Sequence, residues 1–404
     1  MAPRPRTADL RLGFFEKLSL VPILAAVLGK TFWTALTAKF ISKRKRPSSF
    51  ARLMGYTALR TLVTHNTSRT EQALAPGTDD SYLAYCKRFN VQPVTETLKD
   101  GTNAYWVGSK GAEKVWIFFH GGGYSVPAAP EHFILLHSLI HDLNNNSATT
   151  PGNGDGKTQL AALVLHYDVA PFAAYPRQLS QAAQLLNHVL RSLRFAPSNV
   201  LIGGDSAGGN LTLALLSHVL HPHPEVPIVD LAPDEAGEDG GEGSENRLRA
   251  AVLISPWVSF DTSTASYARN ATRDMISAAS VTRWATLFLG GRPTDPYNEP
   301  VDVPAGWWKG LDTKAVRDVL FLAGEYEVLL DGILNSSTAS AAEISSLTPK
   351  IPSPSPAPAP RRRRVASEVD PANTVEGLHR RHTWRQREPY QYAEQQDVLA
   401  LDSD

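Results

Sequence analysis

Short apolar runs alternate with segments of helix-spaced apolar positions through most of the chain after residue 104. A few consecutive apolar residues are typical of a buried strand, whereas apolar residues three and four positions apart indicate one face of a helix. Expected strands cover 115–119, 160–165, 200–203, 250–254, 319–322 and 365–369, and expected helices cover 131–143, 177–193 and 211–220. This alternation predicts an α/β fold with a mostly parallel, doubly wound sheet and helices on both faces.

A separate apolar stretch, residues 18–38, precedes this alternation. It is about as long as the roughly 20 residues that a membrane-spanning helix needs. Lys30 interrupts it, however, Pro22 lies near its start, and a basic cluster at 43–46 follows it. We therefore expect an amphipathic helix that covers part of the core. A membrane anchor or an interfacial helix is the alternative, so the expected location is intracellular, either cytoplasmic or membrane-associated.

The pattern divides the chain into two parts. We expect residues 1–95 to form a helical segment and residues 96–404 to form the α/β domain. Three segments break the rhythm of the second part and are expected to be loop insertions. One is rich in Asn and Gly, one is acidic, and one has proline at alternate positions followed by four arginines. They cover residues 144–157, 233–246 and 335–364.

Composition narrows the range of functions for these 404 residues. Hydrophobic residues make up 42% of the chain and charged residues 20%, which excludes a disordered protein and a multi-span membrane protein. The 40 basic residues balance the 40 acidic ones, so we expect no nucleic-acid partner. The single cysteine, Cys86, excludes an intrachain disulfide or a zinc site of several thiolates, and we expect it to be a small buried hydrophobe.

Residues Gly204–Gly208 have the form G-x-S-x-G and lie between a predicted strand and a predicted helix. In such a turn the serine, here Ser206, has a strained backbone, and the glycines leave room for the strand and the helix to approach. The turn lifts the hydroxyl out at the carboxyl edge of the sheet, and the helix points its first N–H groups toward the same place. Ser206 is therefore the predicted nucleophile.

A second loop supports this interpretation. His120, Gly121, Gly122 and Gly123 directly follow the predicted strand 115–119. Successive glycines allow bare backbone N–H groups to face an oxygen that becomes negative in the transition state. This loop and the G-x-S-x-G turn occur together in esterases and lipases. The pair, in this order and each after a strand, predicts a serine hydrolase whose oxyanion hole lies in the first loop.

A serine hydroxyl also needs a base, and in this architecture an acid and then a histidine follow the serine along the chain. The acid candidates, Glu325, Glu327 and Asp331, come just after a predicted strand. The base candidates, His379 and His382, come after the last predicted strand. Local sequence does not choose within either set.

These motifs resemble those of the hormone-sensitive-lipase branch of the α/β-hydrolase superfamily, in particular its fungal esterases and steryl acetyl hydrolases. The resemblance covers residues 100–385. It is carried by His120–Gly123, Tyr167–Pro171, Tyr175-Pro176, Gly204–Gly209, Ser255–Trp257, Gly324–Glu327 with Asp331, and Gly377 with His379.

The resemblance implies a Ser-Glu-His triad with Glu327 as the acid and His379 as the base. It also implies a helical cap built from the first ninety residues and from residues 261–289. The oxyanion-hole N–H groups that it implies belong to Gly122, Gly123 and Ala207. This chain departs from the pattern in two ways, because an insertion widens the interval from acid to histidine to 52 residues and two arginines directly follow His379. His382 is the rival base.

Residues and resemblance together predict a serine hydrolase that cleaves a carboxylic ester and needs neither a cofactor nor a metal. His221 and His223 lie in a Pro-rich loop without a converging acidic cluster, so we expect no zinc there. The expected partner is a small-molecule ester. The aromatic cap candidates favour a short acyl ester of an apolar alcohol, such as an acetate in sterol or fungal secondary metabolism. These candidates are Trp257, Trp284 and Phe288.

Two alternatives and one question stay open at this point. The first alternative is an enzyme that uses the same pocket for elimination or cyclisation in secondary-metabolite biosynthesis. The second is a ligand-binding protein that has lost turnover, because a fold does not by itself determine a function. The sequence does not indicate an oligomeric state.

Overall fold

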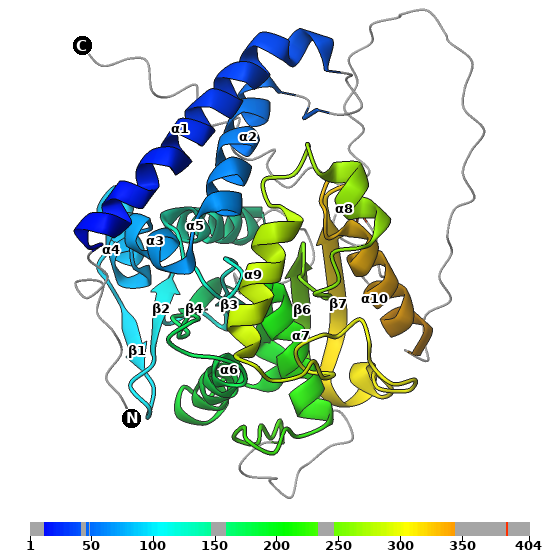
Figure 1. Cartoon of the computed structure of the whole chain (residues 1–404). Helices are drawn as coiled ribbons and strands as arrows, with labels where there is room; N and C mark the ends of the chain where they lie inside the picture. The colour runs from blue at the N-terminus through cyan, green and yellow to red at the C-terminus, as the bar shows by residue number, and fades with distance from the viewer. Residues whose placement is uncertain are drawn as a thin grey trace, which may run out of the picture.

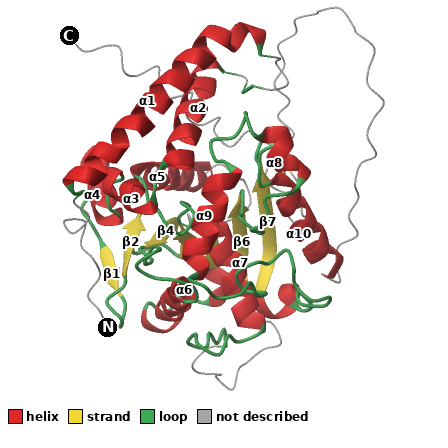
Figure 2. Cartoon of the chain, viewed as in Figure 1, coloured by secondary structure: helices red, strands yellow, loops and turns green. Residues whose placement is uncertain are grey.

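The computed structural model describes residues 12–41, 46–47, 49–146, 159–232, 246–343 and 385–386. Within these ranges, an eight-stranded sheet runs through the molecule with helices on both faces (Figures 1 and 2). The strand order is β1-β2-β4-β3-β5-β6-β7-β8. The pairs β1–β2 and β2–β4 are antiparallel, and all the other pairs are parallel. The predicted α/β fold with a mostly parallel sheet is confirmed.

Five of the predicted strands are present, and the structure lengthens four of them at the ends. The two antiparallel strands at one end of the sheet, β1 and β2, were not predicted because they are short and lie outside the parallel alternation. The strands are β1 (Thr95–Thr97), β2 (Asn103–Val107), β3 (Lys114–Phe119), β4 (Leu160–Leu165), β5 (Val200–Asp205), β6 (Leu248–Ile254), β7 (Val316–Ala323) and β8 (Arg385–Gln386).

The last strand differs from the expectation. The stretch 365–369 lies outside the described residues, and the described edge strand β8 is found further along the chain. Arg385 pairs with Leu322 at the carboxyl end of β7. Both candidate histidines therefore precede this strand in the sequence, whereas we expected them to follow the last strand.

The register of the parallel strands brings their carboxyl ends to one edge. Phe119 of β3 is opposite Gly204 of β5, which is opposite Leu253 of β6, and Leu253 is opposite Phe321 of β7. Because these four positions form one row across the sheet, the loops that follow the four strands leave it side by side. The glycine loop, the serine turn and the acid loop predicted from the sequence therefore share this edge.

All three predicted helices of the α/β domain are present. Two loop predictions are partly wrong, because α5 continues through Asn146 and α10 occupies residues 330–343. Residues 335–343 contain three alanines and neither Gly nor Pro, which favours helix over loop. The rest of the three insertions lies outside the described residues. The helices are α5 (Pro130–Asn146), α6 (Arg177–Asn187) with its π-helical extension η5 (His188–Ser192), η6 (Pro197–Asn199), α7 (Ala207–Leu220), η7 (Leu311–Ala315) and α10 (Leu330–Glu343).

The N-terminal segment is helical and packs against a second helical segment from the middle of the chain. The N-terminal helices are α1 (Phe14–Thr37), η2 (Ala38–Phe40), α2 (Phe50–His65), α3 (Ser68–Leu74) and α4 (Thr78–Phe89). The middle segment contains α8 (Ala265–Asn270) and α9 (Ala278–Leu289). Arg283 of α9 donates to the backbone oxygen of Val63 at 2.7 Å, and Thr64 donates to the hydroxyl of Ser277 at 2.8 Å. In Figure 1, α9 lies in front of the sheet, and α2 lies above it beside α1.

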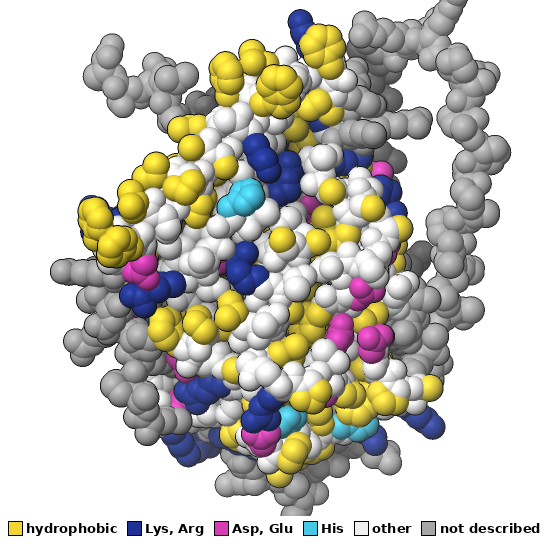
Figure 3. All heavy atoms as spheres, viewed as in Figure 1, with side chains coloured by type: hydrophobic (Ala, Val, Ile, Leu, Met, Phe, Trp, Pro, Cys, Tyr) yellow, Lys and Arg dark blue, Asp and Glu magenta, His cyan; other side chains and the backbone are white. Residues whose placement is uncertain are grey.

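Helix α1 does not cover the core, contrary to our expectation. None of its residues is buried, and it packs along α2 rather than on the sheet. Its apolar side chains line the outer edge of the molecule (Figure 3). With η2 it forms a 27-residue segment, Phe14–Phe40, which contains an 18-residue window of mean hydropathy 1.5 and is long and apolar enough to cross a membrane. The sequence pattern indicated a helix correctly, but apolar length alone did not reveal which surface it contacts.

The core consists of two apolar layers, one on each face of the sheet. Alternate residues of β3 point to opposite layers, so that Ile117 contributes to one and Phe118 to the other. The first layer packs under α6, α7 and α9, and the second under α4 and α5. Cys86 lies buried in the second layer as a free thiol, as we expected.

Candidate active site

Ser206 sits on a tight turn between β5 and α7. Its backbone has φ 52° and ψ −115°, a strained conformation for a residue with a side chain. Backbone hydrogen bonds hold it there, because its N–H donates to the oxygen of Ile254 at 2.9 Å and its oxygen accepts the N–H of Trp257 at 2.9 Å. The structure therefore gives Ser206 the strained strand–turn–helix backbone predicted from the sequence.

The glycines beside Ser206 are required by close backbone approach. A Cβ atom at Gly208 would lie 1.8 Å from the oxygen of Phe119, and one at Gly204 would lie 2.2 Å from the same atom. Any side chain at either position would push β3 away from the serine turn. The spacing of the motif therefore lets the glycine loop after β3 lie directly against the nucleophile turn.

The glycine loop His120–Gly123 is fixed at its start by Asp205. The N–H of Gly121 donates to Oδ1 of Asp205 at 2.8 Å, so this amide is engaged and serves to anchor the loop. The next two amides, and that of Ala207, donate to no acceptor among the described residues. Three backbone N–H groups therefore remain available at the edge where Ser206 lies.

Gly123 is in the left-handed region with φ 59°, and an aromatic ring covers it. A Cβ atom there would lie 2.5 Å from Cδ2 of Trp284 on α9. The turn that follows is closed by two hydrogen bonds, in which the N–H groups of Ser125 and Val126 donate to the oxygen of Gly122 at 3.0 and 2.9 Å. Only glycine fits between this turn and the Trp284 ring.

His120 is fully buried and has a structural role. Its ring stacks on that of Tyr167 at 4.1 Å between centroids, and the Tyr167 hydroxyl donates to the His120 backbone oxygen at 2.7 Å. Burial lowers the pKa of His120 to about 3, with a smaller contribution from His132. A neutral, buried imidazole of this kind holds the start of the loop and does not act as a base near neutral pH.

Asp205 forms an ion pair with His132 of α5 beside the nucleophile. Nε2 of His132 lies 3.5 Å from Oδ1 of Asp205. Burial alone would raise the pKa of Asp205, but the charge and hydrogen bond of His132 and the Gly121 N–H lower it below its usual value. Burial likewise opposes the charge on His132, and Asp205 outweighs it and raises the pKa of His132. The pair keeps Asp205 ionised and able to hold Gly121.

Glu327 lies in the loop after β7 with one carboxylate oxygen engaged and one buried and free. The Ser255 hydroxyl donates to Oε1 at 2.6 Å, and the Gly324 N–H donates to the same atom at 2.8 Å. Oε2 is buried and has no hydrogen-bond partner among the described residues. Burial raises the pKa of Glu327 to about 7, and Asp274 adds to this effect, although the two hydrogen bonds oppose it.

The two other acid candidates face elsewhere. Glu325 is exposed to solvent. Both oxygens of Asp331 are used by α8, because Oδ2 accepts the Ser266 N–H at 2.7 Å and Oδ1 accepts from Arg269 at 2.8 Å. Of the three candidates, only Glu327 therefore presents a buried oxygen without a partner in the described part of the chain.

The acid loop is held by residues that the sequence did not single out. Asn270 at the end of α8 donates to the backbone oxygens of Glu325 and Glu327, at 3.2 and 2.8 Å. Asp274 accepts the Val328 N–H at 2.6 Å, and Ser266 donates to the Val328 oxygen at 2.6 Å. No local pattern marks these positions, because their partners lie more than fifty residues away along the chain.

The remaining candidates fall into three groups. His379 and His382 lie outside the described residues. His221 and His223 bind backbone and aromatic neighbours, and the described residues contain no group of three or more His, Cys, Asp or Glu side chains that could hold a metal ion. The three aromatic cap candidates are buried in the first core layer and do not line an open surface. They are Trp257, Trp284 and Phe288.

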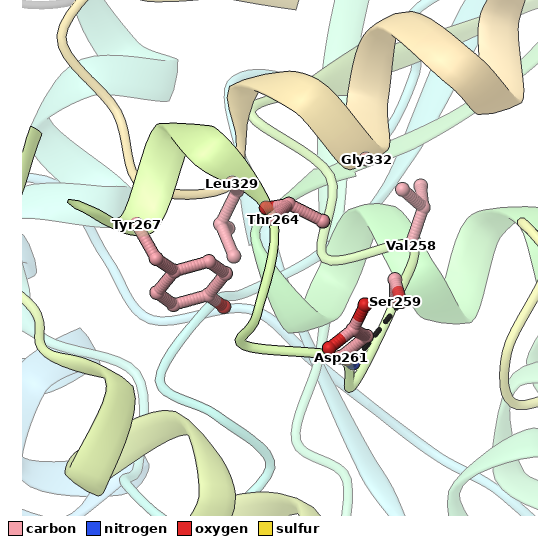
Figure 4. A pocket seen from close by; sticks show the side chains of 7 residues that line it. All are labelled: Val258, Ser259, Asp261, Thr264, Tyr267, Leu329 and Gly332. Atoms are coloured by element: carbon pink, nitrogen blue, oxygen red, sulfur yellow. Dashed lines mark hydrogen bonds between the residues drawn. The ribbon is translucent and has the colours of Figure 1, made fainter. Parts of the chain in front are cut away.

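A small pocket lies beside the acid loop, between α8 and α10 (Figure 4). Tyr267 and Leu329 border it on one side and Asp261 on the other, and the two oxygens of Asp261 accept the N–H and the hydroxyl of Ser263 at 2.8 and 3.0 Å. None of the candidate catalytic residues lines it. We therefore assign it to packing between the helices rather than to the site.

Comparison with known proteins agrees with this architecture. The sequence profile of the α/β hydrolase fold family matches residues 116–336, more than half of the chain. Steryl acetyl hydrolase 1 of Saccharomyces cerevisiae is 24% identical over 216 residues, which is 52% of this chain and 42% of that protein. An acetyl-hydrolase of Streptomyces hygroscopicus is 26% identical over 216 residues, which is 53% of this chain and 58% of that protein. The chain thus spans about half the length of the curated relatives that it matches.

Among solved structures, the chain is similar to an esterase from the bacterial hormone-sensitive lipase family. The two are 23% identical with a TM-score of 0.48, and the similarity covers 74% of this chain and 86% of that chain.

Proposed function

The chain belongs to the α/β hydrolase fold family, and on that premise we propose that it is a serine hydrolase of carboxylic esters. Ser206 attacks the ester carbonyl while a histidine takes the hydroxyl proton, and the same histidine then protonates the leaving alkoxide. Water then attacks the acyl-enzyme while the same histidine takes its proton, and the histidine returns a proton to Ser206 as the acid leaves. The N–H groups of Gly122, Gly123 and Ala207 hold the oxyanion, and the acid at Glu327 orients the histidine and stabilises its charged form.

The observation that carries this proposal is Oε2 of Glu327, which is buried and has no hydrogen-bond partner among the described residues. A buried carboxylate oxygen without a donor is costly, and such atoms in native proteins call for a partner. An imidazole N–H is a donor of the right kind, and its positive charge during catalysis would offset the burial that raises the pKa of Glu327 to about 7. Glu327 is thus arranged to receive a histidine at the edge where Ser206 lies.

The histidine is proposed to come from the segment just before β8. His379 is our first candidate and His382 the rival. They precede Arg385, which pairs with Leu322 at the end of β7, by six and three residues. Because a chain spans at most about 3.6 Å per residue, these short tethers support a base supplied from this segment.

The proposed substrate class is a short acyl ester. Both curated relatives named above are acetyl-hydrolases, and one acts on steryl acetates by its name. We propose that this chain also hydrolyses acetyl esters. We further propose that the leaving group is an apolar alcohol. The buried positions of the three aromatic candidates give this choice of alcohol no support of their own.

Attachment to a membrane is proposed for helix α1. Its exposed side chains include Leu24, Leu28, Phe32 and Trp33, each at least half exposed, and a basic cluster follows at 43–46. An apolar helix surface next to Lys and Arg residues fits an anionic lipid surface. Because α1 packs along α2, we propose that it lies in the interface.

A fluorophosphonate probe combined with a panel of acetate, butyrate and octanoate esters tests the proposed chemistry. Labelling should be lost in Ser206→Ala, and turnover should be lost in Ser206→Ala and in one of His379→Ala and His382→Ala. Glu325→Gln is the matched control for Glu327→Gln and should keep wild-type turnover. Labelling without turnover of any ester would favour elimination or cyclisation, and a folded protein without labelling would favour a binding protein.

A further inference from the structure

We propose that Glu71 and Gln72, on the short helix α3, are positioning residues for the oxyanion hole. They hold the turn formed by residues 122–125 from outside, through two independent contacts. The inference rests on the proposed ester hydrolysis and adds to it a requirement for the N-terminal segment. Helix α3 lies outside residues 116–336, the part of the chain that matches the family profile.

Gln72 binds the oxyanion turn directly. Its side chain is 2% exposed, and its amide nitrogen donates to the backbone oxygens of Ser125 and Ala170, both at 2.7 Å. Ala170 in turn donates its N–H to the oxygen of Tyr124 at 2.7 Å. One buried amide group thus joins the turn to the loop after β4. Its two acceptors, the oxygens of Ser125 and Ala170, belong to residues on either side of Tyr124, which directly follows Gly123.

Glu71 acts on the same turn through Trp284. One of its carboxylate oxygens accepts the indole N–H at 3.0 Å, and the other accepts from Arg283 at 2.5 Å. The side of the Trp284 ring lies against Cα of Gly123, where a Cβ atom would be only 2.5 Å away. Glu71 therefore fixes the orientation of the ring, and the ring limits how far Gly123 can move.

These contacts bear on catalysis because the oxyanion hole depends on backbone placement. Its N–H donors must lie within hydrogen-bond distance of an oxygen that moves during the reaction, and a small misplacement weakens each bond. Glycine adopts the φ of 59° at Gly123 without strain and is conformationally permissive, so the position of this turn depends on the contacts that hold it. A turn held by two buried polar side chains is preorganised, whereas one held by packing alone could shift without breaking a hydrogen bond.

Gln72→Met tests the first contact, and Gln178→Met is the matched control. Gln178 is 1% exposed and also donates to two backbone oxygens, those of Asp168 and Ala173, at 2.9 and 3.1 Å. Each variant removes one side-chain donor from two carbonyls, which are buried at Gln72 and part-buried at Gln178, so both should lose thermal stability and Gln72→Met at least as much as Gln178→Met. Only Gln72→Met should lower kcat, by about 10- to 100-fold with KM changed less than about threefold, because the ground-state ester needs the oxyanion donors little.

A conservative pair tests the second contact. Glu71→Gln keeps an oxygen that accepts the Trp284 indole N–H and should retain kcat within about threefold. Glu71→Leu loses that acceptor and should lower kcat about tenfold or more. Equal kcat in Glu71→Leu and Glu71→Gln would show that the indole contact does not position the turn.

Hydrogen exchange measured by mass spectrometry separates failure of this inference from failure of the proposed function. The peptide containing residues 121–126 should exchange at least tenfold faster in Gln72→Met than in Gln178→Met, whether or not any ester is turned over. An unchanged exchange rate would refute the proposal that Gln72 holds the turn 122–125. Faster exchange together with unchanged kcat in an active enzyme would refute the role of Gln72 in catalysis. If the wild-type protein cleaves no ester in the panel, only the proposed function is refuted. The exchange rates then still show whether Gln72 holds the turn 122–125.

Discussion

Oδ2 of Asp274 accepts the backbone N–H of Val328 at 2.6 Å, and this bond joins the segment between α8 and α9 to the loop that carries Glu327. The other oxygen of Asp274 accepts two further N–H groups, from Met275 and Ile276. The carboxylate is 8% exposed, and burial raises its pKa although all three N–H groups oppose this. The acid loop is thus held in place by an anion from a different part of the chain.

Asp274→Ala is expected to destabilise the protein and to lower activity. It would leave three N–H groups without their acceptor, and each buried unpaired group costs about 1–3 kcal/mol. We expect a loss of about 3 kcal/mol in the free energy of unfolding, measured in urea, and a fall in kcat of about tenfold at temperatures where the variant is folded. Asp261→Asn, which changes an exposed carboxylate just before α8, should stay within about 0.5 kcal/mol of wild type. Equal stability of the two variants would contradict the assignment.

Ser206 offers a test that separates strain from chemistry. Its φ of 52° is costly for any residue with a Cβ atom, by about 1–3 kcal/mol, and glycine avoids most of that cost. Both Ser206→Ala and Ser206→Gly should abolish turnover, but the glycine variant should unfold at a higher temperature than the alanine variant. Calorimetry of the two variants measures the difference. A glycine variant that is less stable than the alanine variant would show that the turn is not strained.

The alternation of strands and helices along the chain could be predicted from the sequence, because buried parallel strands are apolar on both faces and are visible as short apolar runs. The loop positions followed from the same pattern, since loops after parallel strands leave one edge together. Choosing Glu327 over Glu325 and Asp331 could not be derived locally. That choice depends on Ser255 and on the ends of α8, which approach the loop only in the folded chain.

Other features stayed hidden for related reasons. Gln72 reaches residues 53 and 98 positions away, so no periodicity marks it. Helix α1 was interpreted wrongly because apolar composition does not distinguish a helix that covers a core from one that faces outward. The alternate prolines and the arginines of the third insertion predict a loop, but they lie after residue 350 and do not determine the structure of its first residues. The roles of His379 and His382 stay predictions.

Glu327 should make stability depend on pH in a direction opposite to that of an ordinary ion-paired acid. Its pKa in the folded protein is raised to about 7, so ionisation is easier in the unfolded chain. The folded state therefore has its full stability below the unfolded pKa of about 4.5 and loses part of it as pH rises toward 7. Where the parent lacks the base, as in His379→Ala or His382→Ala, Glu327→Gln should match the parent at pH 4 and be more stable at pH 8, by up to about 3 kcal/mol. In wild type, where we propose an imidazole partner for Glu327, Glu327→Gln should gain less.

The same variant should lose activity, since a neutral amide cannot stabilise an imidazolium. We expect kcat to fall about 10²- to 10⁴-fold. Denaturation in urea at pH 4, 6 and 8 measures the stability, and Glu325→Gln, at an exposed position, should show no such divergence with pH. If the stability difference between Glu327→Gln and a parent that lacks the base were the same at all three pH values, the carboxylate would not be buried without compensation.

Gly123→Ala should damage the oxyanion hole more than the fold. The added methyl group would lie 2.5 Å from the Trp284 ring, and φ 59° is unfavourable for alanine. Gly101→Ala is the matched control, because Gly101 has φ 81° but nothing within 4 Å of a new Cβ atom. Both should lose about 1 kcal/mol from the backbone, but only Gly123→Ala should lower kcat, by about 100-fold. Similar kcat in both variants would place the Trp284 contact outside the reaction.

The exposed apolar surface of α1 should bind lipid, because leaving large apolar side chains in water has a cost that a membrane interface removes. Each such side chain contributes about 1.5–3 kcal/mol on full transfer from water. The triple variant Leu24→Gln, Leu28→Gln, Phe32→Gln should therefore lose flotation with vesicles of phosphatidylcholine and phosphatidylserine while keeping its melting temperature. These three side chains are 51%, 70% and 66% exposed and contribute little to the core.

A triple variant away from α1 distinguishes lipid binding by this helix from nonspecific adsorption through exposed apolar side chains elsewhere. Leu74→Gln, Leu83→Gln, Ile228→Gln removes side chains that are 52%, 52% and 70% exposed elsewhere on the surface. It should float like wild type. Binding to phosphatidylserine vesicles should also weaken as salt rises from 0.05 to 0.5 M if the basic cluster at 43–46 contributes, because screening shortens its reach to about one Debye length of a few ångströms. Equal flotation of both triple variants would remove α1 as the membrane-binding element, and salt-independent binding would assign it to the apolar face alone.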